Sequence, residues 1–149
     1  MSGMVNIVVA DFDEVEAIGE STRPIEEWRG FAANGVGAEK LAMLQSMMTG
    51  QTFDEALSEY DPVYAASEDG PWVMRVREEL IESLANQDEE ILEEIGEELA
   101  ATAEFEMDGW PVDAAQAFVA ELASLAEISV AQEKAIFVWT NVEVRRVDS

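Results

Sequence analysis

The sequence predicts an α+β fold in which about five helices pack on a small mixed or antiparallel sheet of about three strands. Short runs rich in β-branched and aromatic residues stand near both ends of the chain and once in its middle. Between these runs, apolar residues recur three and four positions apart, as they do on the buried face of a helix. The length of 149 residues falls within the roughly 100–200 residues of one domain. We therefore expect a single globular domain, 1–149, with a frayed C-terminal tail from about residue 143.

Three apolar runs are the predicted strands. The first, at 5–9, is Val-Asn-Ile-Val-Val, and the second, at 72–76, follows a turn predicted at 67–71. The third, at 135–139, is apolar without alternation, which is typical of a strand that is central in its sheet or covered on both faces. A loop is expected at 34–37, where an Asn-Gly pair is followed by a second glycine.

The helix predictions depend on apolar spacing and on the residues at the helix ends. Gly50 stands where a C-terminal cap belongs, and Thr52 with Glu55 forms a capping-box pattern at the start of the next helix. The strongest amphipathic pattern begins at an Asp88 cap, with leucine and isoleucine on one stripe and glutamates on the opposite face. The expected helical segments are 11–18, a single turn at 25–31, 38–49, 52–60, 78–85, 88–102 and 113–132.

The ionisable residues exclude most catalytic chemistry. The chain has 33 acidic and eight basic residues, a formal net charge of −25, no histidine and no cysteine. It therefore lacks Ser–His and Cys–His nucleophile pairs, as well as thiolate and imidazole metal ligands. The sequence also contains no dinucleotide-binding glycine motif and no P-loop. We expect no catalytic residue, no metal site and no cofactor, and we expect the two lysines, Lys40 and Lys134, on the solvated surface.

The same charge constrains partners and location. Nucleic acids and anionic membranes carry the same sign of charge as this chain, so we expect neither as a partner. No apolar run approaches the ~20 residues of a membrane span, and the first four residues have no basic signal-peptide segment. The absence of cysteine gives no disulfide framework. A cytoplasmic location is the expectation.

Glutamates gather on the helix predicted at 88–102. Glu90, Glu93, Glu94 and Glu97 share the face opposite its apolar stripe. Such a face is ordinarily a solvated helix surface. With most catalytic groups absent, it is also our candidate for contact with a basic protein. The sequence therefore favours a non-enzymatic interaction or regulatory module that binds a basic partner.

Two alternatives stay open on the same residues. A carboxylate-only, Mg²⁺-dependent phosphohydrolase requires at least two acids converging in a pocket, drawn from the glutamate face or from Asp11 and Asp13 after the first strand. A nucleic-acid mimic requires a line of charge. Nine acids lie in 88–106, which at a helix rise of about 1.5 Å per residue is roughly half the linear charge density of B-DNA.

Aromatic residues at element edges supply the remaining candidates. Trp28 and Trp110 both stand among polar or turn-forming neighbours. Tryptophan in such a setting either anchors a binding hot spot or closes the end of a small core. If Trp28 and Trp110 converge with Tyr60 and Tyr64 around a cleft, that cleft is the predicted binding site.

Three segments carry a family resemblance. They are Lys-Leu-Ala-Met-Leu-Gln-Ser-Met-Met-Thr-Gly at 40–50, Val-Arg-Glu-Glu-Leu at 76–80 and Lys-Ala-Ile-Phe-Val-Trp at 134–139. In order and type they resemble the YfbM-like family of uncharacterised bacterial proteins. The resemblance implies a bacterial α+β protein. Because the family has no assigned activity, the resemblance implies no chemistry.

Overall fold

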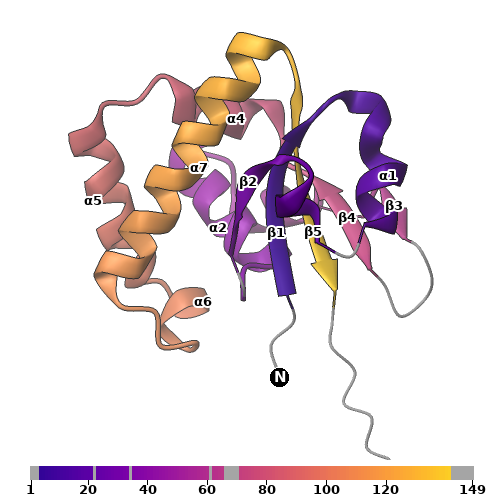
Figure 1. Ribbon diagram of the computed structural model, residues 1–149. Coiled ribbons are helices and arrows are strands. Elements are labelled where there is room, and N and C mark those ends of the chain that lie inside the picture. The colour runs from indigo at the N-terminus through magenta and orange to yellow at the C-terminus, as the bar shows by residue number, and fades with distance from the viewer. Residues whose placement is uncertain (1–3, 22, 34, 61, 66–70, 142–149) are drawn as a thin grey trace, which may run out of the picture.

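The computed structural model has the α+β fold that the sequence predicts, with helices on both faces of one antiparallel sheet (Figure 1). The predicted frayed tail, from about residue 143, lies outside the described residues. The structure describes residues 4–21, 23–33, 35–60, 62–65 and 71–141.

The sheet has five strands in the order β2-β1-β5-β4-β3, and every neighbouring pair is antiparallel. The two long strands, β1 and β5, lie near its centre and pair from Met4 opposite Asn141 to Ala10 opposite Ala135. The two short outer strands, β2 and β3, are its edges. The strands are β1 (Met4–Ala10), β2 (Arg29–Ala32), β3 (Tyr64–Ala65), β4 (Trp72–Arg75) and β5 (Ala135–Asn141).

The finer prediction of about three strands and five helices was too low, because the described residues form five strands and seven α-helices. Both missed strands are edges. β2 falls where one helical turn was expected at 25–31, and its Arg-Gly-Phe-Ala sequence has no alternation to indicate a strand. β3 has two residues. Such short segments become strands through pairing with a neighbour, which local sequence does not show.

Six helices build the main core on one face of the sheet. Leu44, Leu122 and Ile136 are fully buried there. Two of the predicted caps are confirmed: Gly50 is left-handed, with φ of 84°, and the amide of Glu55 donates to Thr52 Oγ1 at 3.1 Å. Asp88 is the N-cap residue of α5, but its side chain accepts no cap hydrogen bond. The helices are α2 (Ala38–Thr49), α3 (Phe53–Leu57), α4 (Glu78–Ala85), α5 (Glu89–Ala100), α6 (Ala103–Glu106) and α7 (Val112–Gln132).

A smaller core covers the opposite face of the sheet. Ile18 packs there with Val73 and Trp139, and all three are fully buried. Cores on both faces explain the unbroken apolar run at the start of β5, where residues 135–139 are all buried. The elements on this side are the 3₁₀ turn η1 (Phe12–Glu14), α1 (Val15–Glu20) and the 3₁₀ turn η2 (Pro24–Glu26).

Among the described residues, α7 alone is long and apolar enough to satisfy a length-and-composition test for a membrane span. The mean hydropathy of its most apolar stretch is 1.3, and 44% of that stretch is buried inside the fold. A core helix satisfies the same test. The exposed side of α7 carries Asp113, Glu121 and Glu127.

Candidate functional site

An acidic groove lies between the first half of α5 and the middle of α7, with a volume of about 410 Å³. We call it the α5–α7 groove. Its apolar lining includes the half-buried Leu92 and the buried Ala123. Three exposed carboxylates line it, and polar amide and hydroxyl groups complete it. The lining residues are Gln87, Glu89, Leu92, Glu93, Gln116, Ala120, Ala123, Ser124 and Glu127.

A glycine in α5 sets the geometry of this groove. Gly96 is buried, and a Cβ atom placed on it would lie 2.6 Å from the Cα atom of Gln116 in α7. Only glycine allows the two helix backbones to approach this closely. Next to the crossing, the side-chain amide of Gln116 donates to the main-chain oxygen of Glu93 at 3.0 Å. The close crossing and the hydrogen bond fix the position of α5 relative to α7.

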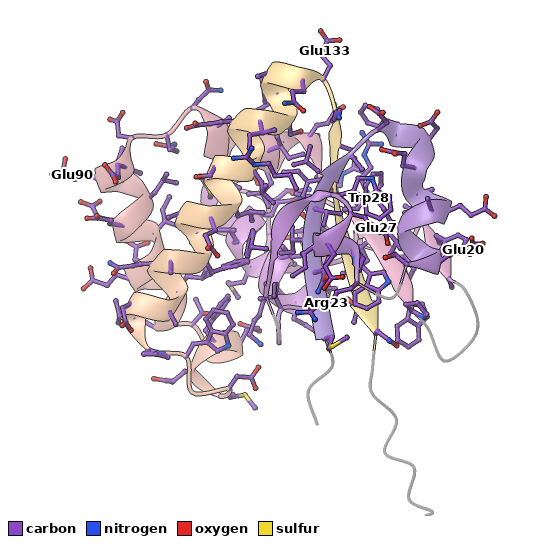
Figure 2. The ribbon with its side chains drawn as sticks, in the orientation of Figure 1. Glu20, Arg23, Glu27, Trp28, Glu90 and Glu133 are labelled. Carbon is purple, nitrogen blue, oxygen red and sulfur yellow. The ribbon has the colours of Figure 1, made fainter. Side chains whose placement is uncertain are left out.

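Among the described residues, no cation pairs with the carboxylates that line the groove. Between Arg77 and Lys134 the sequence has seventeen acidic residues and no lysine or arginine. All six glutamates of α5 are exposed, and Figure 2 shows Glu90 pointing away from the fold. Within the part of the chain that the structure describes, no ion pair involves a residue of α5 or α7. The groove therefore lies in a strongly negative field.

The structure divides the predicted glutamates into two groups. Glu93 lines the α5–α7 groove, whereas Glu90, Glu94 and Glu97 are exposed but do not line it. The sequence reasoning missed Glu127, which α7 contributes. It also passed over Glu89, although that residue belongs to the same acidic face. The pairing of α5 with α7 decides which glutamates meet, and amphipathicity alone does not specify the partner helix.

The four predicted aromatic residues do not converge. Trp28 and Tyr64 pack against the smaller core on one face of the sheet, whereas Tyr60 and Trp110 belong to the main core on the other. The expectation of one cleft formed by all four is therefore not met. Tyr60 is 3% exposed, so it serves the core and presents no surface to a ligand.

Tyr64 and Trp110 each have a structural partner. The ring of Tyr64 lies over Gly19 of α1, where an added Cβ atom would be 2.1 Å from a ring carbon. Burial of this ring raises the pKa of Tyr64, and the carboxylates of Glu20 and Glu16 raise it further. Trp110 makes an edge-on contact with Phe105, with ring centroids 5.0 Å apart. Both contacts are those of residues that close the ends of a core.

The acids after β1 serve the start of a helix. Asp11 is the N-cap of η1, and its amide donates to Glu14 Oε1 at 2.9 Å in a capping box. In the described part of the chain, no group of three or more acidic side chains is placed to hold a metal ion. Asp11 therefore has a structural role at the start of η1.

One lysine departs from its predicted place. Lys40 was expected on the solvated surface, but it is 6% exposed and forms an ion pair with Asp108. Its ammonium group also lies 5.5 Å from the ring centroid of Phe105. The aliphatic part of a lysine side chain packs well at the edge of a core when a carboxylate pairs with its ammonium group. That partner is 68 positions away in the sequence, so no local pattern indicates it.

Comparison of the chain with models of known protein families, with curated proteins and with solved structures finds no match. The YfbM-like resemblance therefore stays a prediction from the sequence.

Proposed function

We propose that this chain is a non-enzymatic interaction module that binds a basic partner protein at the α5–α7 groove. The observation that carries the proposal is the coincidence of a concave surface with carboxylates that no described cation pairs. Glu89 and Glu93 come from α5 and Glu127 from α7, so the acids converge across two helices. A solvated helix face alone has no such concavity.

The lining of the groove suits a lysine or arginine side chain. These side chains place an apolar stem along apolar surface while the charged head stays near polar groups. Here Leu92 and Ala123 would contact the stem, and the carboxylates of Glu89, Glu93 and Glu127 would receive the head. Each charge-assisted hydrogen bond formed in this way is stronger than a neutral one.

The surrounding acids would increase the association rate rather than fix the orientation of the partner. Exposed charges attract an oppositely charged protein over a distance of about one Debye length, which is roughly 8 Å at physiological salt. We therefore expect the association rate to fall as salt is added, while groove contacts determine the dissociation rate.

Affinity capture with matched variants tests the proposal. The tagged chain is incubated with host lysate at about 10 mM and about 150 mM salt, beside the triple variant E89Q/E93Q/E127Q. The control D13N/E16Q/E20Q removes the same number of exposed charges from the opposite face of the sheet. We expect a basic protein to be retained by the wild type and by the control, and to be lost from the groove variant.

Two outcomes contradict the proposal. If no basic protein is retained at low salt, the acidic surface has no such partner under these conditions. If both triple variants lose the partner equally, net charge alone explains the binding and the groove has no special role.

A nucleic-acid mimic would also bind a basic partner. Competition with duplex DNA distinguishes a mimic from a chain that binds its partner in another way. A partner captured through nucleic-acid mimicry uses its nucleic-acid surface, so excess duplex DNA would displace this chain from it. A partner that binds this chain through another surface would bind duplex DNA and this chain at the same time.

A further inference from the structure

The sheet has an exposed edge at β2. The ladder between β1 and β2 pairs Asn6 with Ala32 and Val8 with Gly30, and no other strand of the described residues pairs with the far side of β2. Ala32 is exposed and Gly30 is half-buried. Unpaired strand edges of this kind present backbone donors and acceptors to any extended chain that approaches.

The register shows which backbone groups face outward. The amide of Ala33 donates to the main-chain oxygen of Val5 at 2.8 Å, so this pair is hydrogen-bonded. Antiparallel ladders alternate between hydrogen-bonded and non-hydrogen-bonded pairs. Phe31 therefore directs its N–H and C=O groups toward β1. Gly30 and Ala32 direct theirs away from β1, onto the free edge.

A shallow apolar groove of about 280 Å³ runs beside this edge, between β2 and the start of α7. We call it the β2–α7 groove. Phe31 and Trp110 line it, and the ring of each makes an edge-on contact with Phe118, at centroid distances of 6.3 and 6.0 Å. The exposed Ala117 leaves room on the helix side, and Glu121 adds one carboxylate to the lining.

We propose that the β2 edge and the β2–α7 groove together bind an extended segment of a basic protein by strand addition. Main-chain hydrogen bonds to Gly30 and Ala32 would give affinity, and the groove would select one apolar side chain, as in other cases of strand addition. The inference rests on the proposed function only in taking the partner to be basic.

Charge selects a basic segment over a second copy of this chain. Two copies would bring together net charges of −25 each, and pairing of their edges would be opposed by that repulsion. A basic segment is instead attracted, and Glu121 in the groove offers it a specific partner.

The geometry also predicts the pattern of the bound segment. Side chains of an added strand alternate between faces, and the residue opposite Phe31 lies on the same face as Phe31 itself. That residue would enter the β2–α7 groove and should be apolar. A lysine or arginine two positions away would lie on the same face and reach Glu121.

Panning of a random peptide library on the immobilised wild-type chain provides the probe, and three variants provide the test. A32P removes an outward amide that β1 does not use, since proline is tolerated at edge positions of this kind. A117R fills the β2–α7 groove with a repelling charge without touching the strand. A120R places the same side chain three positions along α7, where it lines the α5–α7 groove instead.

We expect enriched peptides to carry an apolar residue with a basic residue two positions away. Their affinity should fall about tenfold or more in A32P and in A117R, and it should fall further in A117R than in A120R, which places the same charge in the α5–α7 groove. On binding, the amides of Gly30 and Ala32 should gain protection from hydrogen exchange in the wild type. Thermal melting of each variant confirms that it is folded.

Three results would overturn the inference. One is panning that enriches no sequence. Another is enriched peptides that bind A32P and A117R as tightly as the wild type. The third is a wild-type dimer that A32P converts to monomer, which would assign the edge to a second copy. None of these results affects the capture experiment with E89Q/E93Q/E127Q. Conversely, loss of peptide from A120R with retention by A117R would leave the proposed α5–α7 function standing.

Discussion

The hydroxyl of Tyr60 donates a 2.6 Å hydrogen bond to the side-chain oxygen of Gln45, and both residues are buried. The Gln45 amide in turn donates to Gln51 at 2.6 Å and to Glu59 at 3.0 Å. A polar chain thus runs from the core under α2 and α3 to the surface, where Glu59 also meets Arg77 at 3.3 Å. Buried polar groups with complete hydrogen bonding specify one arrangement of the helices around them.

Removing the Tyr60 hydroxyl should destabilise the fold. In Y60F the side-chain oxygen of Gln45, which is fully buried, loses its donor. An unsatisfied buried acceptor costs about 1–3 kcal/mol. For a chain of this size each kcal/mol corresponds to a melting shift of about 2–4 °C, which calorimetry measures. Equal stability of Y60F and wild type would contradict the hydrogen-bonding role.

Glu59 should contribute to the acid sensitivity of the fold. Hydrogen bonds from Gln51 and then Gln45 lower the pKa of Glu59 below its ordinary value of 4.5, with Arg77 acting in the same direction. The stability that follows from a lowered folded-state pKa is fully present above the unfolded value and is lost as pH falls through the folded one. E59Q should therefore be less stable than wild type near neutral pH, and the difference should shrink below pH 4.5.

Denaturant titrations of both proteins at a series of pH values check this expectation. E55Q is the matched control, because Glu55 lies four positions before Glu59, in α3, but outside the network of Gln45 and Gln51. A stability difference between E59Q and wild type that stays constant into the acid range would show that charge on Glu59 has no part in it.

The sequence predicts correctly those elements that depend on residues close together in the chain. The apolar run of β5, the capping box of Thr52 and Glu55 and the glycine end of α2 each depend on neighbouring residues, and each is confirmed. The two edge strands were missed because pairing creates them. Phe31 becomes part of β2 because Ile7 stands opposite it, a contact between residues 24 positions apart.

The candidate sites were predicted in part for the same reason. Helical periodicity places Glu93 on an acidic face, but only the packing of α5 on α7 brings Glu127 to it. Gly96 marks that packing, although an isolated glycine in a helix pattern has several possible explanations. The aromatic cleft was not found because Tyr60 and Tyr64, four residues apart, point into cores on opposite faces of the sheet.

Removing only one partner of the Lys40–Asp108 ion pair should lower the stability of the fold more than replacing both partners. In D108N the ammonium group of Lys40, whose side chain is 8% exposed, loses its counter-charge. Removal of one partner from a fully buried pair costs about 3–5 kcal/mol. Because the Asp108 side chain is 55% exposed, water can approach, and we expect a smaller loss, about 1–2 kcal/mol. K40M/D108N should regain most of it, since methionine fills the volume of the lysine stem. Chemical denaturation measures all three proteins, and a double variant no more stable than D108N would contradict the argument.

Replacing Glu133 by glycine should stabilise the fold. Glu133 ends α7 with φ of 57°, and it is the one residue other than glycine with positive φ in the described chain. Its side chain extends into solvent at the end of α7 (Figure 2). Glycine adopts this left-handed conformation without the steric cost of a Cβ atom. We expect E133G to gain about 1 kcal/mol and E133A, which removes the same carboxylate, to gain nothing comparable. If both variants are equally stabilised, relief of charge repulsion is the cause and the backbone conformation is not.

Salt should stabilise the native state, because the compact fold holds its acids closer together than the unfolded chain does. At a net charge of −25 the carboxylates repel one another, and seventeen of them fall in the stretch between Arg77 and Lys134, which has no cation. Raising ionic strength from about 10 mM to about 150 mM shortens the Debye length from roughly 30 Å to roughly 8 Å. The melting temperature should therefore rise over this interval, and sodium and potassium chloride should act equally, because screening depends on ionic strength alone.

The rise should be smaller in E89Q/E93Q/E127Q than in D13N/E16Q/E20Q, since the first variant relieves the most crowded acids at the same change in net charge. A response that is equal in the two variants would locate the repulsion in the molecule as a whole and not in the helices that form the α5–α7 groove.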